Sequence, residues 1–168
     1  MRRKKNIIDE LSIRMRLENT TDEEMIALIS ENVQDLEMGD RAGATLLWHA
    51  VLCKRRKVAE WLVAHGVNIN TQEENGFSAL HLAVQEKNIE MTAYLLRMGA
   101  DINIRDKFGN TPIIRTDLTT PVELLRVLLE NGADVDAKND YGVSCRDKYI
   151  AYADRLELFD EYGKYTER

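Results

Sequence analysis

The sequence predicts an all-α solenoid, in which helix-turn-helix units with short β-hairpin turns repeat with a period of 33 residues. Two glycine series share one phase: Gly43, Gly76, Gly109 and Gly142, and then Gly66, Gly99 and Gly132. A hydroxyl residue stands two positions after each glycine of the first series, as Thr45, Ser78, Thr111 and Ser144. Independent series with one period indicate stacked units, each burying its apolar face only against its neighbours.

Each unit reads as a turn followed by two helices. In the second unit, Asn75-Gly76 is a dipeptide typical of a tight turn with positive backbone dihedral angles. Ser78 then stands at the N-cap position of a short first helix. Residues 89–98 predict a second helix, which the following glycine ends in the left-handed conformation.

The unit resembles the ankyrin repeat, a family with the signature T-P-L-H-x-A and the same period. The strings that match this signature are Thr45-Leu46-Leu47-Trp48-His49-Ala50, Ser78-Ala79-Leu80-His81-Leu82-Ala83 and Thr111-Pro112-Ile113-Ile114. The strings that match the closing turn of the family are Gly66-Val67-Asn68-Ile69-Asn70, Gly99-Ala100-Asp101-Ile102-Asn103 and Gly132-Ala133-Asp134-Val135-Asp136. The match covers residues 20–160, so the resemblance implies a stand-alone ankyrin-repeat protein of the bacterial type.

Some positions depart from the family pattern. Trp48 stands where the family usually has histidine, and it is expected in the core or on the concave surface. Residues 113–117 replace the usual L-H-x-A-A, so the first helix of that unit is expected to be short or distorted. Thr120-Pro121 predicts the start of its second helix, with threonine as the N-cap. Residues 145–148 lack the usual apolar pair, as expected for a terminal cap.

The period divides the chain into one ankyrin-repeat domain, residues 1–168. Its expected parts are a degenerate N-terminal cap (6–38), three repeats (40–72, 73–105 and 106–138) and a C-terminal cap repeat (139–162). The N-terminal cap is expected to hold helices over residues 6–17 and 22–30, the latter opened by a capping box of Thr21 and Glu24. Residues 154–162 predict the closing helix, and residues 163–168 are expected to fray.

Composition narrows the partner class. The net charge is −6 and the pI is near 5.2, which argues against nucleic acid and favours a protein partner with a basic surface. Cys53 and Cys145 lie nearly three repeats apart, too far for a disulfide, and indicate a reducing, cytoplasmic location. The sequence lacks an apolar stretch of roughly 20 residues, so no membrane contact is expected. The free protein is expected to be a monomer.

No pattern in the sequence predicts a catalytic, metal or cofactor site. The three histidines, His49, His65 and His81, are 16 residues apart and lack a metal-ligand spacing, so structural roles are expected. Asp134-x-Asp136 begins like a calcium loop, but Lys138 at its fifth position breaks the pattern. An enzyme hidden in the array would need a convergent set of titratable groups in a pocket.

Aromatic residues at the turns suggest the contact surface. Phe77, Phe108 and Tyr141 lie beside the turn glycines, where exposed aromatics act as anchors for a partner, unless each folds back over its own hairpin. In the ankyrin family, hairpin tips and the exposed face of the first helix carry variable contacts. The residues at those positions are Arg41, Ala42, Ala44, Trp48, Leu52, Cys53, Glu74, Asn75, Phe77, Gln85, Glu86, Lys107, Phe108, Asn110, Asp140, Tyr141 and Val143. Trp61 is expected in the core.

The sequence therefore predicts a non-enzymatic protein that binds another protein through its hairpin tips and concave face. The sharpest hypothesis, by analogy with bacterial ankyrin proteins, is an immunity protein that neutralises a toxin. An effector or regulatory scaffold in a eukaryotic cell is the alternative, and an undetected enzyme is a third. The basic runs Arg2–Lys5 and Lys54–Lys57 would serve targeting or phosphate binding under the alternative, or are simply solvated.

Overall fold

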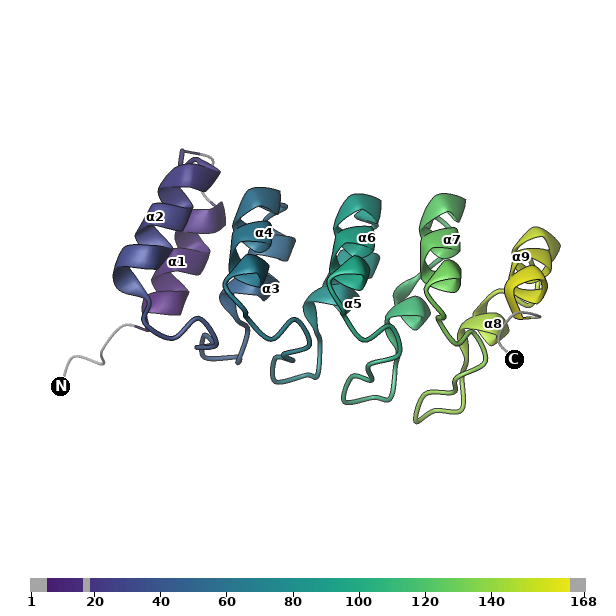
Figure 1. Cartoon of the computed structure of the whole chain (residues 1–168). Coiled ribbons are helices and arrows are strands. Elements are labelled where there is room, and N and C mark those ends of the chain that lie inside the picture. The colour runs from purple at the N-terminus through teal and green to yellow at the C-terminus, as the bar shows by residue number, and fades with distance from the viewer. Residues whose placement is uncertain (1–5, 17–18, 164–168) are drawn as a thin grey trace. The chain divides into compact units, whose positions relative to one another are not determined.

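A computed structural model describes residues 6–16 and 19–163. The chain divides into two compact units, residues 1–79 and 80–168. Within the described residues the regular structure is helical, and extended backbone pairs only as the isolated bridges Gly39–Thr45 and Gln72–Ser78. In each unit the helices come in pairs and a long loop leads from one pair to the next, as the all-α prediction requires (Figure 1). No helix in the described part of the chain is long and apolar enough to cross a bilayer.

Unit 1 packs four helices in two layers. They are α1 (Ile7–Arg16), α2 (Asp22–Asn32), α3 (Leu46–Leu52) and α4 (Arg56–Ala64). Helix α1 packs on α2 and α3, and α4 packs on α2 and α3, so each helix buries one apolar face. The predicted face of α1, with Ile8, Leu11 and Met15, is buried. The predicted capping box of Thr21 and Glu24 opens α2.

Unit 2 continues the same order. Its elements are α5 (Ala79–Gln85), which begins at the last residue of unit 1, α6 (Ile89–Arg97), the 3₁₀ helix η1 (Pro112–Arg115), α7 (Val122–Glu130), α8 (Cys145–Lys148) and α9 (Ala153–Gly163). Helix α6 packs on α7, and α7 packs on α9. The predicted closing helix is therefore present as α9, and Tyr149 meets its Phe159 edge to face, with ring centroids 5.5 Å apart.

The expected distortion of the third first helix is confirmed, because η1 makes a single 3₁₀ turn. The Thr116 hydroxyl donates to the Ile113 carbonyl over 2.7 Å, which satisfies a group that a longer helix would use. Lys148 Nζ donates to the carbonyls of Ile114 and Thr116, at 2.5 and 2.6 Å. A side chain from the C-terminal cap thus replaces the missing helical hydrogen bonds.

The glycines take the positive φ angles that the turns require. Gly99, which ends α6, has φ +93°. Gly109 has φ +73°, and a Cβ there would collide with the side chains of Arg105 and Asp140. At Gly109 the positive φ disfavours a larger residue, and a Cβ would also require the exposed Arg105 and Asp140 side chains to shift.

Three local predictions were wrong or shifted. Helix α7 begins at Val122 with Pro121 as its N-cap, and the Thr120 hydroxyl instead accepts a hydrogen bond from the Asp117 backbone. Trp61 is half-buried rather than in the core, and Trp48, expected in the core or on the concave surface, is also half-buried. Of the expected frayed end, Gly163 closes α9, and residues 164–168 lie outside the described residues, as does Leu17 of the first predicted helix.

Candidate protein-binding surface

The hairpins, two in each unit, are built on one repeated contact. A side-chain oxygen at the first hairpin position accepts hydrogen bonds from the backbone N–H groups two and four residues later. The accepting residues are Asp40, Glu73, Asp106 and Asn139, and the distances lie between 2.8 and 3.0 Å. This is the turn chemistry typical of Asp and Asn. The sequence carries a signal for it, because these four acceptors form a further series with the 33-residue period.

In unit 1, the hairpin of residues 40–44 is tied to helix α3. Asp40 Oδ2 lies 2.9 Å from His49 Nε2, and the His49 side chain is 3% exposed. Burial lowers the pKa of His49, so the ring is neutral and donates from Nε2. Burial acts to raise the pKa of Asp40, but hydrogen bonds from Ala42 and Ala44 hold it below its ordinary value. The Ala42 carbonyl accepts from Glu74 N over 2.7 Å and joins the two hairpins.

In unit 2, the two hairpins present a stacked aromatic pair. The rings of Phe108 and Tyr141 have centroids 6.5 Å apart and an interplanar angle of 25°. Tyr141 is 73% exposed and Phe108 is 45% exposed. The Phe108 carbonyl accepts from the backbone N–H of Asp140 over 3.0 Å, so the hairpins are joined directly beneath the rings. Phe77, in unit 1, is half-buried instead.

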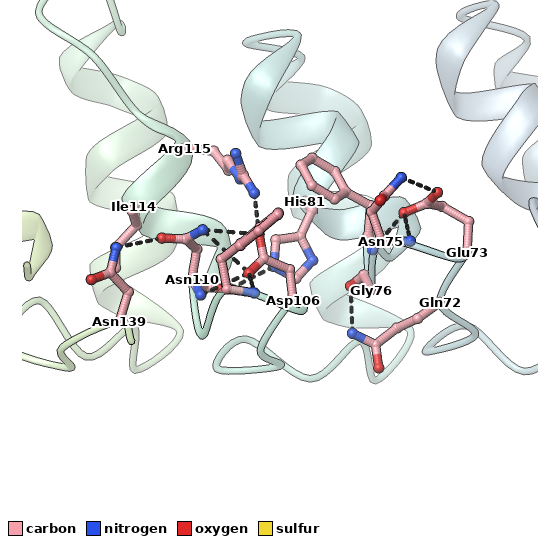
Figure 2. A network of polar contacts seen from close by, with 12 residues as sticks. Gln72, Glu73, Asn75, Gly76, His81, Asp106, Asn110, Ile114, Arg115 and Asn139 are labelled. Carbon is pink, nitrogen blue, oxygen red and sulfur yellow. Dashed lines mark hydrogen bonds and ion pairs between the residues drawn. The ribbon is translucent and has the colours of Figure 1, made fainter. Parts of the chain in front are cut away.

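A buried polar network holds this pair of hairpins in place (Figure 2). The Asp106 carboxylate is 0% exposed and pairs with Arg115, and its Oδ2 accepts from Asn110 Nδ2 over 3.0 Å. Asn110 Oδ1 accepts from Asn139 Nδ2 over 2.7 Å. The Asn110 carbonyl lies 3.0 Å from His81 Nε2, which confirms the structural role expected for that histidine. Helix α5, η1 and both hairpins therefore meet in one set of hydrogen bonds.

Comparison with models of known protein families shows which family these repeated units match. A family model described as ankyrin repeats in many copies matches residues 62–115, and one described as an ankyrin repeat matches residues 42–71. Residues 42–115 of the chain are ankyrin repeats. A curated relative, the ankyrin repeat domain-containing protein OPG015 of monkeypox virus, is 29% identical over 66 residues. That match covers 39% of this chain and 15% of the relative, so the chain spans a small part of that protein. Ankyrin repeats are protein-interaction modules of a typically non-enzymatic family.

Most of the predicted contact set of this protein lies at the surface. Its exposed members are Arg41, Ala42, Glu74, Asn75, Gln85, Glu86, Lys107, Phe108, Asp140, Tyr141 and Val143, and its half-buried members are Trp48, Leu52, Cys53 and Phe77. Two members are corrected, because Ala44 is 4% exposed and Asn110 is 9% exposed. The Asn110 amide is engaged in the buried network, where it donates to Asp106 and accepts from Asn139.

Three of the four side chains in the basic run of residues 54–57 form ion pairs. Arg55 donates to Asp22 over 3.1 Å and to the carbonyls of Met15 and Thr20, so it fastens α4 to the N-terminal cap. Arg56 pairs with Glu60 and Lys57 with Glu23, at 2.8 and 2.7 Å. Two of these pairs are exposed, so they neutralise the run only weakly, whereas Arg55 is largely buried in its contacts. The other basic run, Arg2–Lys5, lies outside the described residues.

A hollow of ≈ 600 Å³ in unit 1 lies between α1 and the first hairpin. Its acidic groups are all paired: Asp9 with Arg41 at 3.3 Å, Glu10 with Arg14 at 3.1 Å, and Asp40 with His49 at 2.9 Å. Each carboxylate is thus held by a cation or an imidazole. The cavity holds no free base poised beside a nucleophile. Within the described residues, no three His, Cys, Asp or Glu side chains gather as metal ligands.

Proposed function

We propose that the protein acts without catalysis, by binding a partner protein through its hairpin tips and the exposed face of its first helices. The observation that carries the proposal is the stacked pair Phe108–Tyr141, large rings that face solvent at 45% and 73% exposure. A few large side chains usually supply most of the energy of an interface. Aromatic rings left in water by the free protein are natural members of that set.

The pair is also pre-organised. Its hairpins are joined by the Asp140–Phe108 backbone hydrogen bond and by the Asn139–Asn110 contact. Groups that are already ordered lose little conformational entropy when a partner binds. The buried network therefore supports a binding role for rings that do not pack in the core.

The tips of unit 1 fit the basic partner that the net charge of −6 favours. Glu74 is exposed beside the second hairpin, and Glu37 and Asp35 lie exposed or half-exposed on the preceding turn. These carboxylates attract a basic surface over a Debye length of about 10 Å at 0.1 M salt. We include a monomeric free state and a cytoplasmic location in the proposal.

Binding without catalysis acts by occlusion, sequestration or scaffolding. We favour an inhibitor of the immunity kind, which neutralises a toxin by covering its functional surface. A regulatory scaffold or effector in a eukaryotic cell is the second candidate. It has less support from the basic run of residues 54–57, since three of its four side chains are held by carboxylates of unit 1. Co-expression with the captured partner separates the two, because an immunity protein restores growth to cells that the partner poisons.

The proposal is tested by affinity capture from the native cell, followed by calorimetry with the purified partner. The double variant Phe108→Ala, Tyr141→Ala should weaken binding at least about thirtyfold, since hot-spot residues each contribute about 2 kcal/mol or more. A matched control is Leu118→Ala, Tyr152→Ala, which removes two other exposed apolar side chains of unit 2, at 50% and 40% exposure. The control should bind like the parent. Equal affinity of the aromatic variant and the parent, with equal melting temperatures, would remove the tips from the interface.

A further inference from the structure

The residues around the aromatic pair carry a local charge opposite to that of the whole chain. Lys107 directly precedes Phe108, and Lys138 lies three residues before Tyr141. Both lysines are exposed, and in the described part of the chain the carboxylates of these hairpins pair with Arg105 and Arg115 and not with Lys107. An exposed lysine is therefore the chain neighbour of an exposed ring.

The carboxylates of the same two hairpins are already engaged. Asp106 is buried and paired with Arg115. Asp140 lies 3.4 Å from Arg105 Nη2, which also donates to the Lys138 carbonyl. A further acid, Asp147, accepts hydrogen bonds from the backbone and hydroxyl of Ser144, and the charge of Lys138 helps to lower its pKa. The lysines are thus the ionic groups of this surface with capacity for a new partner.

We propose that the Phe108–Tyr141 pair receives an apolar side chain that is flanked by carboxylates on the partner protein. The proposal deepens the proposed function, on which it rests. A partner that covers the rings removes water from the neighbouring lysines. A buried charge without a counter-ion is costly, so the segment that covers this pair must bring anions or leave the lysines unpaired. Like charges across the contact would oppose binding further.

Two synthetic peptides test this chemistry directly. One is acetyl-Glu-Glu-Trp-Glu-Glu-amide and the other is acetyl-Lys-Lys-Trp-Lys-Lys-amide, so that the apolar group is the same and only the flanking charge differs. Each is titrated into the full chain while backbone amide shifts are followed by NMR. The acidic peptide should shift the amides of Phe108 and Tyr141 with a dissociation constant at least about tenfold lower than that of the basic peptide. The difference should shrink as salt rises, because exposed charges are screened.

Charge-reversed variants test whether Lys107 and Lys138 cause the preference for the acidic peptide. Lys107→Glu, Lys138→Glu should invert the preference, and Phe108→Ala, Tyr141→Ala should abolish both sets of shifts. Lys87→Glu, at a lysine of unit 2 that pairs with Asp117 in another loop, serves as the control and should leave the preference unchanged.

Equal or tighter binding of the basic peptide at the aromatic pair overturns the inference and leaves the proposed function standing. Absence of shifts at both rings with the acidic peptide at millimolar concentration also overturns it. The proposed function is tested separately. It fails if the Phe108→Ala, Tyr141→Ala variant binds the captured partner with the affinity of the parent.

Discussion

Asn139 donates from its amide nitrogen to the side-chain oxygen of Asn110 over 2.7 Å, across 29 residues of sequence. The remaining polar atoms of both side chains are occupied. Asn139 Oδ1 accepts from the backbone of its own hairpin, and Asn110 Nδ2 donates to Asp106. Neither amide can turn without losing a partner. The two hairpins of unit 2 therefore keep one relative orientation, in which Phe108 stacks on Tyr141.

Replacing Asn110 by alanine should destabilise the protein by about 1–3 kcal/mol, because it leaves buried groups without partners. Asn110 is 9% exposed, so water does not readily replace the lost contacts. Urea unfolding at neutral pH measures the effect. Asn131→Ala is the control, since the Asn131 side chain makes one exposed hydrogen bond, to the Val127 carbonyl over 2.8 Å, and its loss should cost within about 0.5 kcal/mol. Similar midpoints for both variants would mean that the network contributes little.

The fold could be predicted from the sequence because the repeat is marked by residues, such as glycine, that only a few backbone conformations require. Gly99 and Gly109 occupy positive φ angles that few other residues adopt, so their spacing reports the turns directly. The capping box of Thr21 and Glu24 is equally local, and its prediction is confirmed. Elements defined by neighbouring backbone groups can therefore be inferred from the order of residues alone.

The contact surface was less predictable, because exposure depends on packing between repeats. Ala44 and Asn110 occupy tip positions in the sequence, yet both residues are buried. The half-burial of Trp48 is equally a matter of packing, and its indole Nε1 is buried without a hydrogen-bond partner among residues 6–16 and 19–163. The acceptor series from Asp40 to Asn139 could have been found, since it shares the glycine period. The hydrogen bonds that these residues make to neighbouring hairpins and helices depend on tertiary structure, so the sequence does not predict them.

Gly99→Val should destabilise the protein by about 1–3 kcal/mol, as expected for a β-branched residue at positive φ. An added Cβ there meets nothing within 4 Å, so the effect isolates backbone strain from steric collision. Gly99→Asn provides the comparison, because asparagine tolerates the left-handed region, and it should lose much less stability. Thermal and urea unfolding of the three proteins are the measurements. An equal loss for Val and Asn would point to a cause other than φ.

Asp117 makes the stability of unit 2 depend on pH in the acid range. Hydrogen bonds from Thr119 and then Lys87 lower its pKa to about 2, and Lys87 Nζ lies 3.0 Å from Oδ1. The folded pKa is below the ordinary value of about 3.9. The stabilising contribution is therefore fully present above about pH 4 and is lost as pH falls towards 2.

Lys87→Met should raise the pKa of Asp117 and reduce the stability lost between about pH 4 and pH 2. Carboxyl carbon shifts, followed by NMR across that range, report the pKa. Urea midpoints at the same pH values report stability. Arg126→Met removes another exposed cation of unit 2 and should leave the Asp117 titration where it was. A parent pKa near 4 would show that the Thr119 and Lys87 contacts do not persist in solution.

The two free thiols should react at different rates. Cys145 is 0% exposed, and burial raises its pKa to about 11. At pH 8 its thiolate fraction is roughly a thousandth, and the thiolate is the reactive form. Cys53 is half-buried, and burial also raises its pKa, but its side chain has an exposed surface. Iodoacetamide in native buffer should therefore alkylate Cys53 and leave Cys145 intact.

Mass spectrometry of the alkylated peptides, over a series of urea concentrations, measures both sites in one sample. Cys145 should become reactive only with global unfolding, because its thiol lies against the Ile113 carbonyl at 3.5 Å, between η1 and the C-terminal cap. A Cys53→Ser variant is the control, and its remaining thiol should stay silent in native buffer. Labelling of Cys145 well below the unfolding midpoint would show that the cap opens by itself. The packing of α8 against η1 would then contribute little to the stability of unit 2.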